Sequence, residues 1–242
     1  MKNKACLLGM VVLLAALLAL PGVGQSAMWV GAELGGTFQP NTVFSVNGTT
    51  TGHTQIMPAV IGGLTLGYDF VNAGFGAYAW PDWMKYFSFA TDITYNRLMV
   101  QDGGPGIGAG LSANSRLNGY EVVWTFLLMA HYGFLPDSEV PSGRINPYLG
   151  IGPGIVWSGA DFSMRVPDNL VVATTNGRHN ASSTNVALVV EPGVRWMALK
   201  NVSIDTALRW RYSVPSWSND SITIKADPLS QWAVLVRANL HF

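Results

Sequence analysis

Ionisable side chains recur at even spacing in the second half of the chain. Glu191 and Arg195 are four residues apart, and Asp205, Arg209 and Arg211 follow one another at intervals of four and two. Even spacing places side chains on one face of an extended strand, because successive residues of a strand point to opposite sides. Carboxylates and guanidiniums that share such a face can pair with one another. Ion pairing is therefore the chemistry that these residue types and spacings predict.

Other kinds of chemistry find little support in the chain. Histidine is a common base and metal ligand, but none of the four histidines shows ligand spacing with another histidine or a carboxylate. His53 and His179 fall in predicted loops and match no catalytic motif. The glycine-rich run 103–110 does not connect a strand to a helix, so it fails the context test for a phosphate-binding loop. We expect no catalytic residue, no cofactor and no metal.

The last eleven residues, 232–242, form the clearest strand pattern. A strand alternates its faces with period two, and here one face is continuously apolar while the other is mostly polar. The apolar face carries Trp232, Val234, Val236, Ala238, Leu240 and Phe242, and the opposite face carries Ala233, Leu235, Arg237, Asn239 and His241. Arg237 thereby joins the set of charges that lie on polar strand faces.

Seven earlier stretches alternate in the same way. The predicted strands are 29–38, 59–70, 85–99, 120–132, 146–157, 185–197, 202–212 and 232–242. Most are close to the ~10 residues that a tilted strand needs to cross a bilayer. Pro153 removes a ladder hydrogen bond and predicts a bulge in the fifth strand. Long and short connections alternate, except that the aromatic-rich segment 71–84 is long, and we expect it to lie at the lipid interface on the periplasmic side.

The N-terminal segment has the features of a secretory signal peptide. Lys2 and Lys4 precede an apolar run, 7–20, which is followed by small residues up to Ala27. The run is shorter than the ~20 residues of a membrane-spanning helix. We expect cleavage after Ala27, which divides the chain into a leader, 1–27, and a barrel domain, 28–242. Loss of two of the 14 basic residues, and of none of the 14 acidic ones, leaves a net charge of about −2, which argues against nucleic-acid binding.

The mature segment must cross a membrane with strands if it crosses one at all. It has no run of 18 apolar residues, which excludes a transmembrane helix. In lipid every backbone donor and acceptor must be paired within the protein, so strands can span only as a closed barrel. The predicted fold is all-β: an eight-stranded antiparallel transmembrane β-barrel, an up-and-down meander whose first and last strands pair. A soluble lipocalin-like barrel is the alternative, but the charges here share their face with glycine and serine, which fits an interior.

The predicted barrel interior gathers the charged residues. An eight-stranded barrel is just wide enough for its own side chains, and an unpaired buried charge costs several kcal/mol. We expect Glu33, Glu191, Arg209 and Arg237 to meet at mid-depth, with Asp92 nearby. The whole candidate network is Glu33, Asp92, Glu191, Arg195, Asp205, Arg209, Arg211 and Arg237. Aromatic residues near strand ends, including Trp29, are expected at the level of the lipid headgroups.

The mature chain resembles the small eight-stranded outer-membrane family that includes the outer-membrane protein A transmembrane domain, OmpX-like proteins and opacity-type proteins. The stretch Asn146-Pro-Tyr-Leu-Gly-Ile-Gly-Pro-Gly and the strand that stops at Phe242 carry the resemblance. It implies residence in a Gram-negative outer membrane, in contact with outer-membrane lipid and lipopolysaccharide. It also implies that periplasmic chaperones and the barrel-assembly machinery handle the chain, and that the machinery reads a terminal signal. The residues of that signal are Trp232, Val234, Val236, Ala238, Leu240 and Phe242.

Three functions remain open at this point. The first is a structural and surface-contact role in the envelope, with the interior plugged by the charge network and the external loops binding an unknown extracellular ligand. The second is a small gated, porin-like ion path that opens when arginines exchange carboxylate partners. The third is an enzyme that modifies lipid A, which needs a nucleophile or base near the outer leaflet. His131 and His241 are predicted inside the barrel near the periplasmic end, far from that leaflet.

Overall fold

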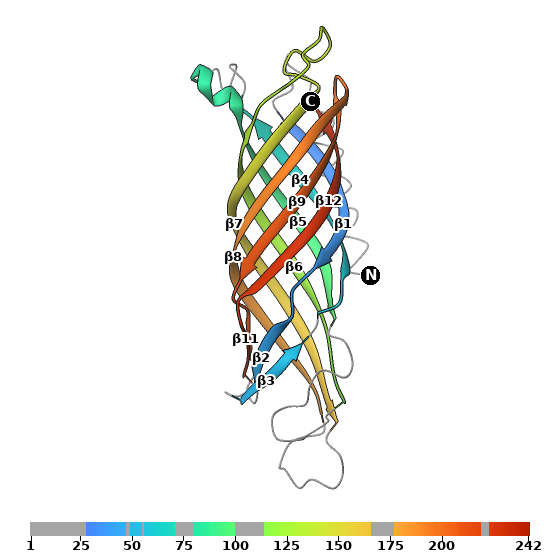
Figure 1. Cartoon of the computed structure of the whole chain (residues 1–242), viewed down its shortest axis with the longest axis vertical. Helices are drawn as coiled ribbons and strands as arrows, with labels where there is room; N and C mark the ends of the chain where they lie inside the picture. The colour runs from blue at the N-terminus through green and yellow to red at the C-terminus, as the bar shows by residue number, and fades with distance from the viewer. Residues whose placement is uncertain are drawn as a thin grey trace, which may run out of the picture.

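The computed structural model of the chain describes residues 28–46, 49–54, 56–70, 80–99, 114–165, 177–218 and 223–242. The predicted signal peptide and its cleavage site lie outside these residues. The described part is a tall barrel of tilted strands (Figure 1). The end that carries the C-terminus is uppermost in this view, and we refer to it as the periplasmic end, because its connections include the short turn at Lys200–Asn201.

Eight long strands form the wall of the barrel. They are β1 (Met28–Phe38), β4 (Ala59–Asp69), β5 (Phe87–Met99), β6 (Asn114–His131), β7 (Ile145–Arg165), β8 (Gly177–Leu199), β9 (Val202–Ser213) and β12 (Leu229–His241). Their order is β8-β7-β6-β5-β4-β1-β12-β9, and a further pairing of β8 with β9 closes the sheet. All these pairings are antiparallel. The predicted eight-stranded antiparallel barrel is confirmed, including the pairing of the first wall strand with the last.

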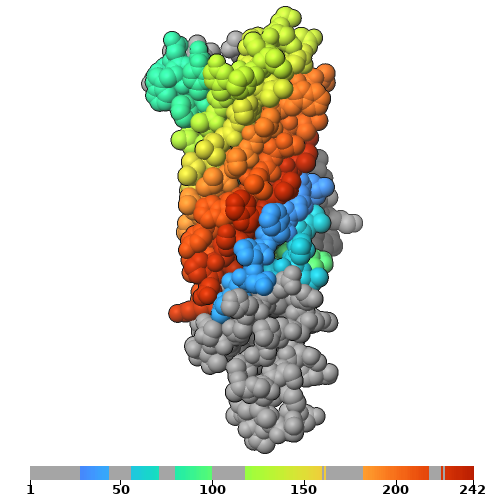
Figure 2. Space-filling model, in the orientation of Figure 1, coloured from blue at the N-terminus to red at the C-terminus, as the bar shows by residue number. Residues whose placement is uncertain are grey.

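Exposure alternates along the wall strands, so that one face of each strand points outward and the other points into the barrel. On β12, Ala233 and Leu235 are 3% and 1% exposed, whereas Val234 and Val236 are 54% and 51% exposed. The outward residues are apolar, and Figure 2 shows the surfaces of β9, β12 and β1 as tilted bands lying side by side. Among the described residues, helices long and apolar enough to cross a membrane are absent.

Four short strands continue the wall beyond its extracellular end. They are β2 (Thr42–Val46), β3 (Thr49–Thr54), β10 (Ser216–Ser218) and β11 (Thr223–Ala226). β2 pairs with β3 and β11, while β10 pairs with β11 and, through Ser218 opposite Ser182, with β8. Figure 1 shows β2, β3 and β11 at the lower end of the barrel. The first and fourth external connections are thus joined to the wall by backbone ladders.

The hairpin of β7 and β8 is much longer than the sequence predicted. Strands were expected to end at 157 and to begin again at 185, but β7 runs to Arg165 and β8 starts at Gly177. The added part is paired, for example Ser158 with Ser183. Its residues include many polar ones, and beyond the lipid a hairpin needs no apolar face. Alternation therefore detects the membrane-spanning part of these strands and misses their extension in water.

Two prolines interrupt the wall without shifting its register. The β6–β7 ladder pairs Thr125 with Gly154 and resumes at Leu128 with Ile151, so Pro153 faces a gap and not the predicted bulge. The β8–β9 ladder likewise skips Glu191 and Pro192 and resumes in the same register. Each proline lacks the N–H that the ladder uses. The strands therefore lose ladder hydrogen bonds at these positions but keep their register.

The periplasmic end carries a short 3-10 helix, η2 (Asp82–Tyr86), directly before β5. The strand predicted from residue 85 therefore begins at Phe87. Of the predicted interfacial segment 71–84, residues 71–79 lie outside the described residues. Trp83 in η2 is 60% exposed, and the Trp80 indole donates to the Tyr68 hydroxyl at 3.4 Å. An aromatic surface at this end is thus present, and its contact with lipid stays a prediction.

Candidate functional site

The centre of the lumen is organised by Arg209, which β9 directs inward. Its Nη1 and Nη2 atoms donate to Asp92 Oδ1 and Oδ2 at 3.0 and 2.7 Å. Its Nε donates to Glu191 Oε2 at 2.6 Å. Asp92 belongs to β5, which is not a neighbour of β9, so this two-pronged contact spans the lumen. The three side chains are buried, and Arg209 uses every guanidinium nitrogen on a carboxylate.

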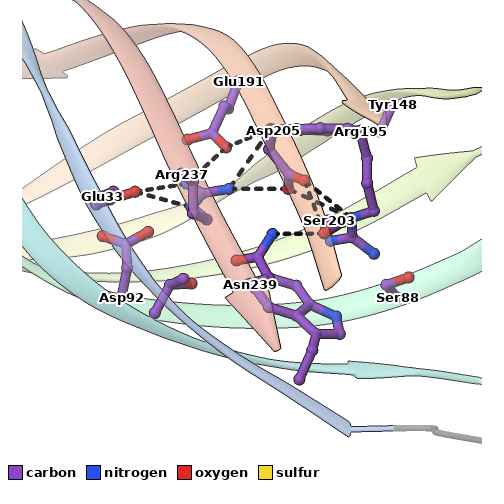
Figure 3. A network of polar contacts seen from close by, with 12 residues as sticks. Glu33, Ser88, Asp92, Tyr148, Glu191, Arg195, Ser203, Asp205, Arg237 and Asn239 are labelled. Atoms are coloured by element: carbon purple, nitrogen blue, oxygen red, sulfur yellow. Dashed lines mark hydrogen bonds and ion pairs between the residues drawn. The ribbon is translucent and has the colours of Figure 1, made fainter. Parts of the chain in front are cut away.

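Arg237 on β12 forms the second half of the central cluster. Its Nε and Nη2 donate to Glu33 Oε2 at 3.0 and 2.6 Å, and Nη2 also lies 3.1 Å from Glu191 Oε1. Glu191 therefore links the two arginines through its two oxygens. The other Glu33 oxygen, Oε1, lies 3.6 Å from Arg209 Nη1. Figure 3 shows Arg237 lying between Glu33, Glu191 and Asp205.

Cross-strand register explains why these charges meet. Glu33 is directly opposite Arg237, Arg237 is opposite Asp205, and Asp205 is opposite Arg195. Four neighbouring strands, β1, β12, β9 and β8, thus place charges of alternating sign in one row across the inner wall. Opposite residues of an antiparallel pair have their Cβ atoms about 5 Å apart, which suits long ionic side chains. Closing the barrel therefore brings the row together.

The row ends in a cluster at the periplasmic end of the lumen. Arg195 Nε lies 3.3 Å from Asp205 Oδ2, and Arg195 Nη1 lies 3.5 Å from Asp69 Oδ1. The Arg195 guanidinium stacks over the Trp29 ring, with its carbon 4.5 Å from the centroid, and the Trp29 indole donates to Asp69 at 3.2 Å. Trp29 is fully buried. Its predicted place at the lipid headgroups is wrong, because its position in β1 directs the ring into the lumen.

A third cluster lies toward the extracellular end of the lumen. Glu121 Oε2 accepts from Arg211 Nη2 at 2.5 Å, from Asn96 Nδ2 at 3.1 Å and from Gln231 Nε2 at 3.3 Å. Arg211 was a predicted site residue without an assigned partner. Asn96 and Gln231 are uncharged, so a prediction based on charged residues does not include them. Their inward positions on alternating strands are the sequence signal that could have identified them.

Apolar side chains fill the lumen around the charges. Leu127, Val189 and Leu235, each 1% exposed or less, belong to one buried apolar cluster of the lumen. A second apolar cluster consists of Val123, Val156 and Ala187. Near the extracellular mouth Trp217 of β10 is fully buried and donates its indole N–H to Ser158 Oγ at 2.9 Å. Paired charges and buried apolar side chains thus both lie inside the described lumen.

Among the described residues, the histidines do not form an accessible catalytic site. His241 Nε2 lies 2.9 Å from Ser203 Oγ, and Ser203 also contacts Asn239 and Asp205. Ser203 has no exposed surface, so solvent does not reach its hydroxyl. His131 and His241 lie at the periplasmic ends of β6 and β12, where the sequence placed them. The side chains of His53 and His179 lie outside the described part of the chain, and within that part no three metal-binding side chains are grouped so that they could hold a metal ion.

The terminal strand places the predicted assembly signal on the outer wall. Val234 and Val236 face outward, and β12 itself ends at His241. Phe242 continues the seam, since its N–H donates to the Met28 carbonyl at 2.9 Å and its carbonyl accepts from Met28 at 3.4 Å. The remaining signal residues, Trp232, Ala238 and Leu240, share the outward parity of Val234. Recognition of these residues by an assembly machinery stays a prediction.

Solved structures of outer-membrane proteins resemble the chain over most of its length. The outer membrane protein OprG from Pseudomonas aeruginosa is 14% identical, with a TM-score of 0.51 over 90% of this chain and 98% of that chain. Neisserial surface protein A is 14% identical, with a TM-score of 0.43 over 91% and 100%. Ail, the attachment invasion locus protein of Yersinia pestis, is 13% identical, with a TM-score of 0.41 over 89% and 99%.

Sequence comparison adds nothing to this likeness, since neither a family model nor a curated protein sequence matches the chain. At 14% identity the likeness to OprG concerns the fold alone. Together with the closed sheet and the apolar outer wall, it shows that the chain has the fold of the small eight-stranded outer-membrane β-barrels.

Proposed function

We propose that this chain is an integral outer-membrane barrel with a structural and surface-contact role, whose lumen is closed by a network of paired charges. The observation that carries the proposal is the completeness of the pairing. Each of the lumen charges described above lies within 3.7 Å of a charge of opposite sign. The six carboxylates are Glu33, Asp69, Asp92, Glu121, Glu191 and Asp205, and the four guanidiniums are Arg195, Arg209, Arg211 and Arg237.

The lumen network supports a plug because it crosses the barrel and does not merely line it. Arg209 joins β9 to β5, and Arg211 of β9 reaches Glu121 of β6. An ion that passed these contacts would have to displace charge-assisted hydrogen bonds, which are the strong ones. The interior of an eight-stranded barrel is just wide enough to be filled by its own side chains, whereas open aqueous channels are typical of barrels with about 16–18 strands.

Surface contact is the part of the role that the extracellular rim supports. β2, β3, β10 and β11 form ladders that join the first and fourth connections to the wall. A platform fixed in this way presents its residues with less conformational freedom than free loops, which lowers the entropic cost of binding a partner. We propose that this rim contacts a molecule at the cell surface and that the barrel anchors it.

Single-channel recording of the purified protein in planar bilayers tests the plug. The wild-type barrel is expected to give no sustained conductance at moderate voltage, and insertion is checked separately by the shift in gel migration between boiled and unboiled samples. Stepwise conductance of the wild type, lost when the protein is boiled, would contradict a closed lumen.

A gated ion path is the second candidate, and one observation favours it. Glu33 lies within reach of two arginines, 2.6 Å from Arg237 and 3.6 Å from Arg209, so a change of partner needs only a small movement. In the same recordings a gated path predicts rare openings in the wild type and longer ones in Glu33→Ala and Arg237→Ala. Silence of all three proteins excludes this candidate and leaves the plug.

A lipid A-modifying enzyme is the third candidate, and no arrangement described above favours it. Overexpression followed by mass spectrometry of lipid A decides the question. An unchanged lipid A spectrum is the result that we expect.

A further inference from the structure

A groove interrupts the lipid-facing wall near the extracellular ends of β8 and β9. Its volume is about 470 Å³, and its lining is mostly apolar. The residues that shape it are Pro153, Val186, Leu188, Tyr212, Ser213 and Val214. A volume of this size lies within the range of small-molecule sites in proteins, which is about 300–1,000 Å³.

Backbone pairing explains the origin of the groove. The β8–β9 ladder has its last pair at Ala187 and Ser213, where β9 ends. Pro215 follows, and β10 rejoins β8 only at Ser218 opposite Ser182. Between these two points residues 214–217 run beside residues 183–186 in the same register but without a ladder pair, and Pro215 lacks the N–H that such a pair would use. The groove lies at this interruption of the ladder. On the other side of β8, Pro153 of β7 completes the lining.

The side chains around the groove belong to the lipid-facing surface. Val186 is 72% exposed, Val214 54%, Leu188 44% and Tyr212 40%. Along β8 the outward positions are apolar from Trp196 to Val186. The next outward positions, toward the extracellular end, are the exposed polar residues Thr184 and Ser182. The apolar wall therefore ends beside the groove, and Tyr212 lies where aromatic rings mark the edge of the hydrocarbon.

We infer that this groove holds one acyl chain of a lipopolysaccharide molecule of the outer leaflet. The groove is continuous with the wall that lipid already covers, so an acyl chain reaches it without crossing water. Its position at the extracellular end of the apolar wall matches the leaflet that lipopolysaccharide forms in outer membranes. The sugar headgroup then lies at the level of Thr184 and Ser182. The inference rests on the membrane placement of the barrel and is independent of whether the lumen conducts.

Native mass spectrometry of the detergent-purified barrel, titrated with hexa-acylated lipid A, tests the inference. We expect the wild type to retain one lipid A molecule. Val186→Phe and Val214→Phe fill the groove from its two sides. Each methylene removed from apolar contact weakens binding about fourfold, so displacing two of them raises the dissociation constant for lipid A by about tenfold or more. Val234→Phe is the matched control, because Val234 is also a lipid-facing valine, 54% exposed, but lies outside the groove.

The outcomes separate a built site from general lipid contact. Loss of the adduct in both groove variants, with retention in Val234→Phe, supports the site. Retention in both groove variants, or equal loss in the control, overturns it. Phosphatidylethanolamine at the same concentration is the second probe, and its preferential retention over lipid A overturns the assignment to lipopolysaccharide. Heat-modifiable gel migration shows that each variant is folded, and all three changes are on the lipid side, where a larger apolar side chain has room.

Discussion

Glu33 and Arg237 face each other across the seam that closes the barrel, in directly opposite positions of β1 and β12. Arg237 Nη2 lies 2.6 Å from Glu33 Oε2, although 204 positions separate the two residues in the sequence. The contact can form only when the first and last wall strands meet. Closure of the sheet and completion of the charge network are therefore the same event.

The seam pair is expected to be strongly coupled. Arg237→Met leaves Glu33 with only Arg209, 3.6 Å away, and loss of one partner of a buried pair costs about 3–5 kcal/mol. Adding Glu33→Gln removes the stranded charge, so the double variant should lose about 1–3 kcal/mol less than the sum of the single variants. Urea unfolding in lipid vesicles measures all three free energies. Additivity to within about 0.5 kcal/mol would show that the pair is not coupled.

The two arginines of β9 form a matched comparison. Arg209 and Arg211 are both buried, but Arg209 binds Asp92 and Glu191, whereas Arg211 binds Glu121 alone. Arg209→Met removes the cation partner of Asp92 and leaves Glu191 with Arg237 alone. Arg211→Met leaves Glu121 with its amide partners, Asn96 and Gln231. We expect the first change to lower the free energy of unfolding in vesicles by about 2 kcal/mol more than the second, given the cost of an unpaired buried charge. Equal losses, or a larger loss for Arg211→Met, would contradict the central place of Arg209.

The terminal residue is expected to matter for assembly more than for stability. Phe242 closes the seam through its backbone, by hydrogen bonds with Met28 that Phe242→Ala retains. The variant should fold in detergent with a change in unfolding free energy of about 1 kcal/mol or less. Its amount in outer-membrane fractions of cells should nevertheless fall severalfold. Phe38→Ala is the control, since Phe38 is a lipid-facing aromatic at a strand end, 46% exposed, away from the terminus. Equal losses in cells would remove the special role of Phe242.

The turn between β6 and β7 is expected to respond to acid. The pKa of Asp137 is lowered from its usual value, first by the hydrogen bond from the Val140 backbone N–H and then by Arg144. A carboxyl group with a lowered pKa stabilises the fold at pH values above its unfolded pKa of about 3.8, and this contribution is lost as pH falls through the lower folded value. The protection factor of the Val140 amide, which is its exchange rate corrected for the intrinsic pH dependence, should therefore fall only at acidic pH. Asp137→Asn should abolish this pH dependence, and its persistence would assign the effect to another group.

The membrane-spanning part of this fold could be predicted from sequence because lipid imposes a strict rule. Charged side chains are costly on the lipid-facing side of a spanning strand, and that constraint makes the alternation of β12 and β9 easy to detect. The outer part of the β7–β8 hairpin, where residues 158–164 pair with residues 177–183, needs only its backbone pairing once it is beyond the lipid, and its β8 side is mostly polar. The β8 side shows no apolar face that would mark it as a strand, and both sides of this outer hairpin were assigned to a loop.

The charge network could be predicted in outline for the same reason. Strand parity identifies which charges point inward, and the order of strands brings Glu33, Glu191, Arg209 and Arg237 together. Parity does not show which partner lies across the lumen, so the contact from Arg211 to Glu121 was missed as a pair. The prediction for Trp29 was wrong because it used only the position of this residue near a strand end. Trp29 lies four residues before the inward-facing Glu33, so it also faces inward. An aromatic residue near a strand end is a girdle residue only when it faces outward.

Thiol labelling of single-cysteine variants tests the closed lumen most directly. Ala233→Cys places a small thiol on the lumen side of β12, 3% exposed in the parent, and the neighbouring Val234→Cys places one on the lipid side. Lys225→Cys in the exposed extracellular hairpin serves as the accessible reference. With a charged maleimide applied to barrels in vesicles, a lumen closed by paired charges and apolar side chains predicts labelling of Lys225→Cys only. Labelling of Ala233→Cys as fast as Lys225→Cys would show a water-filled lumen and contradict the account.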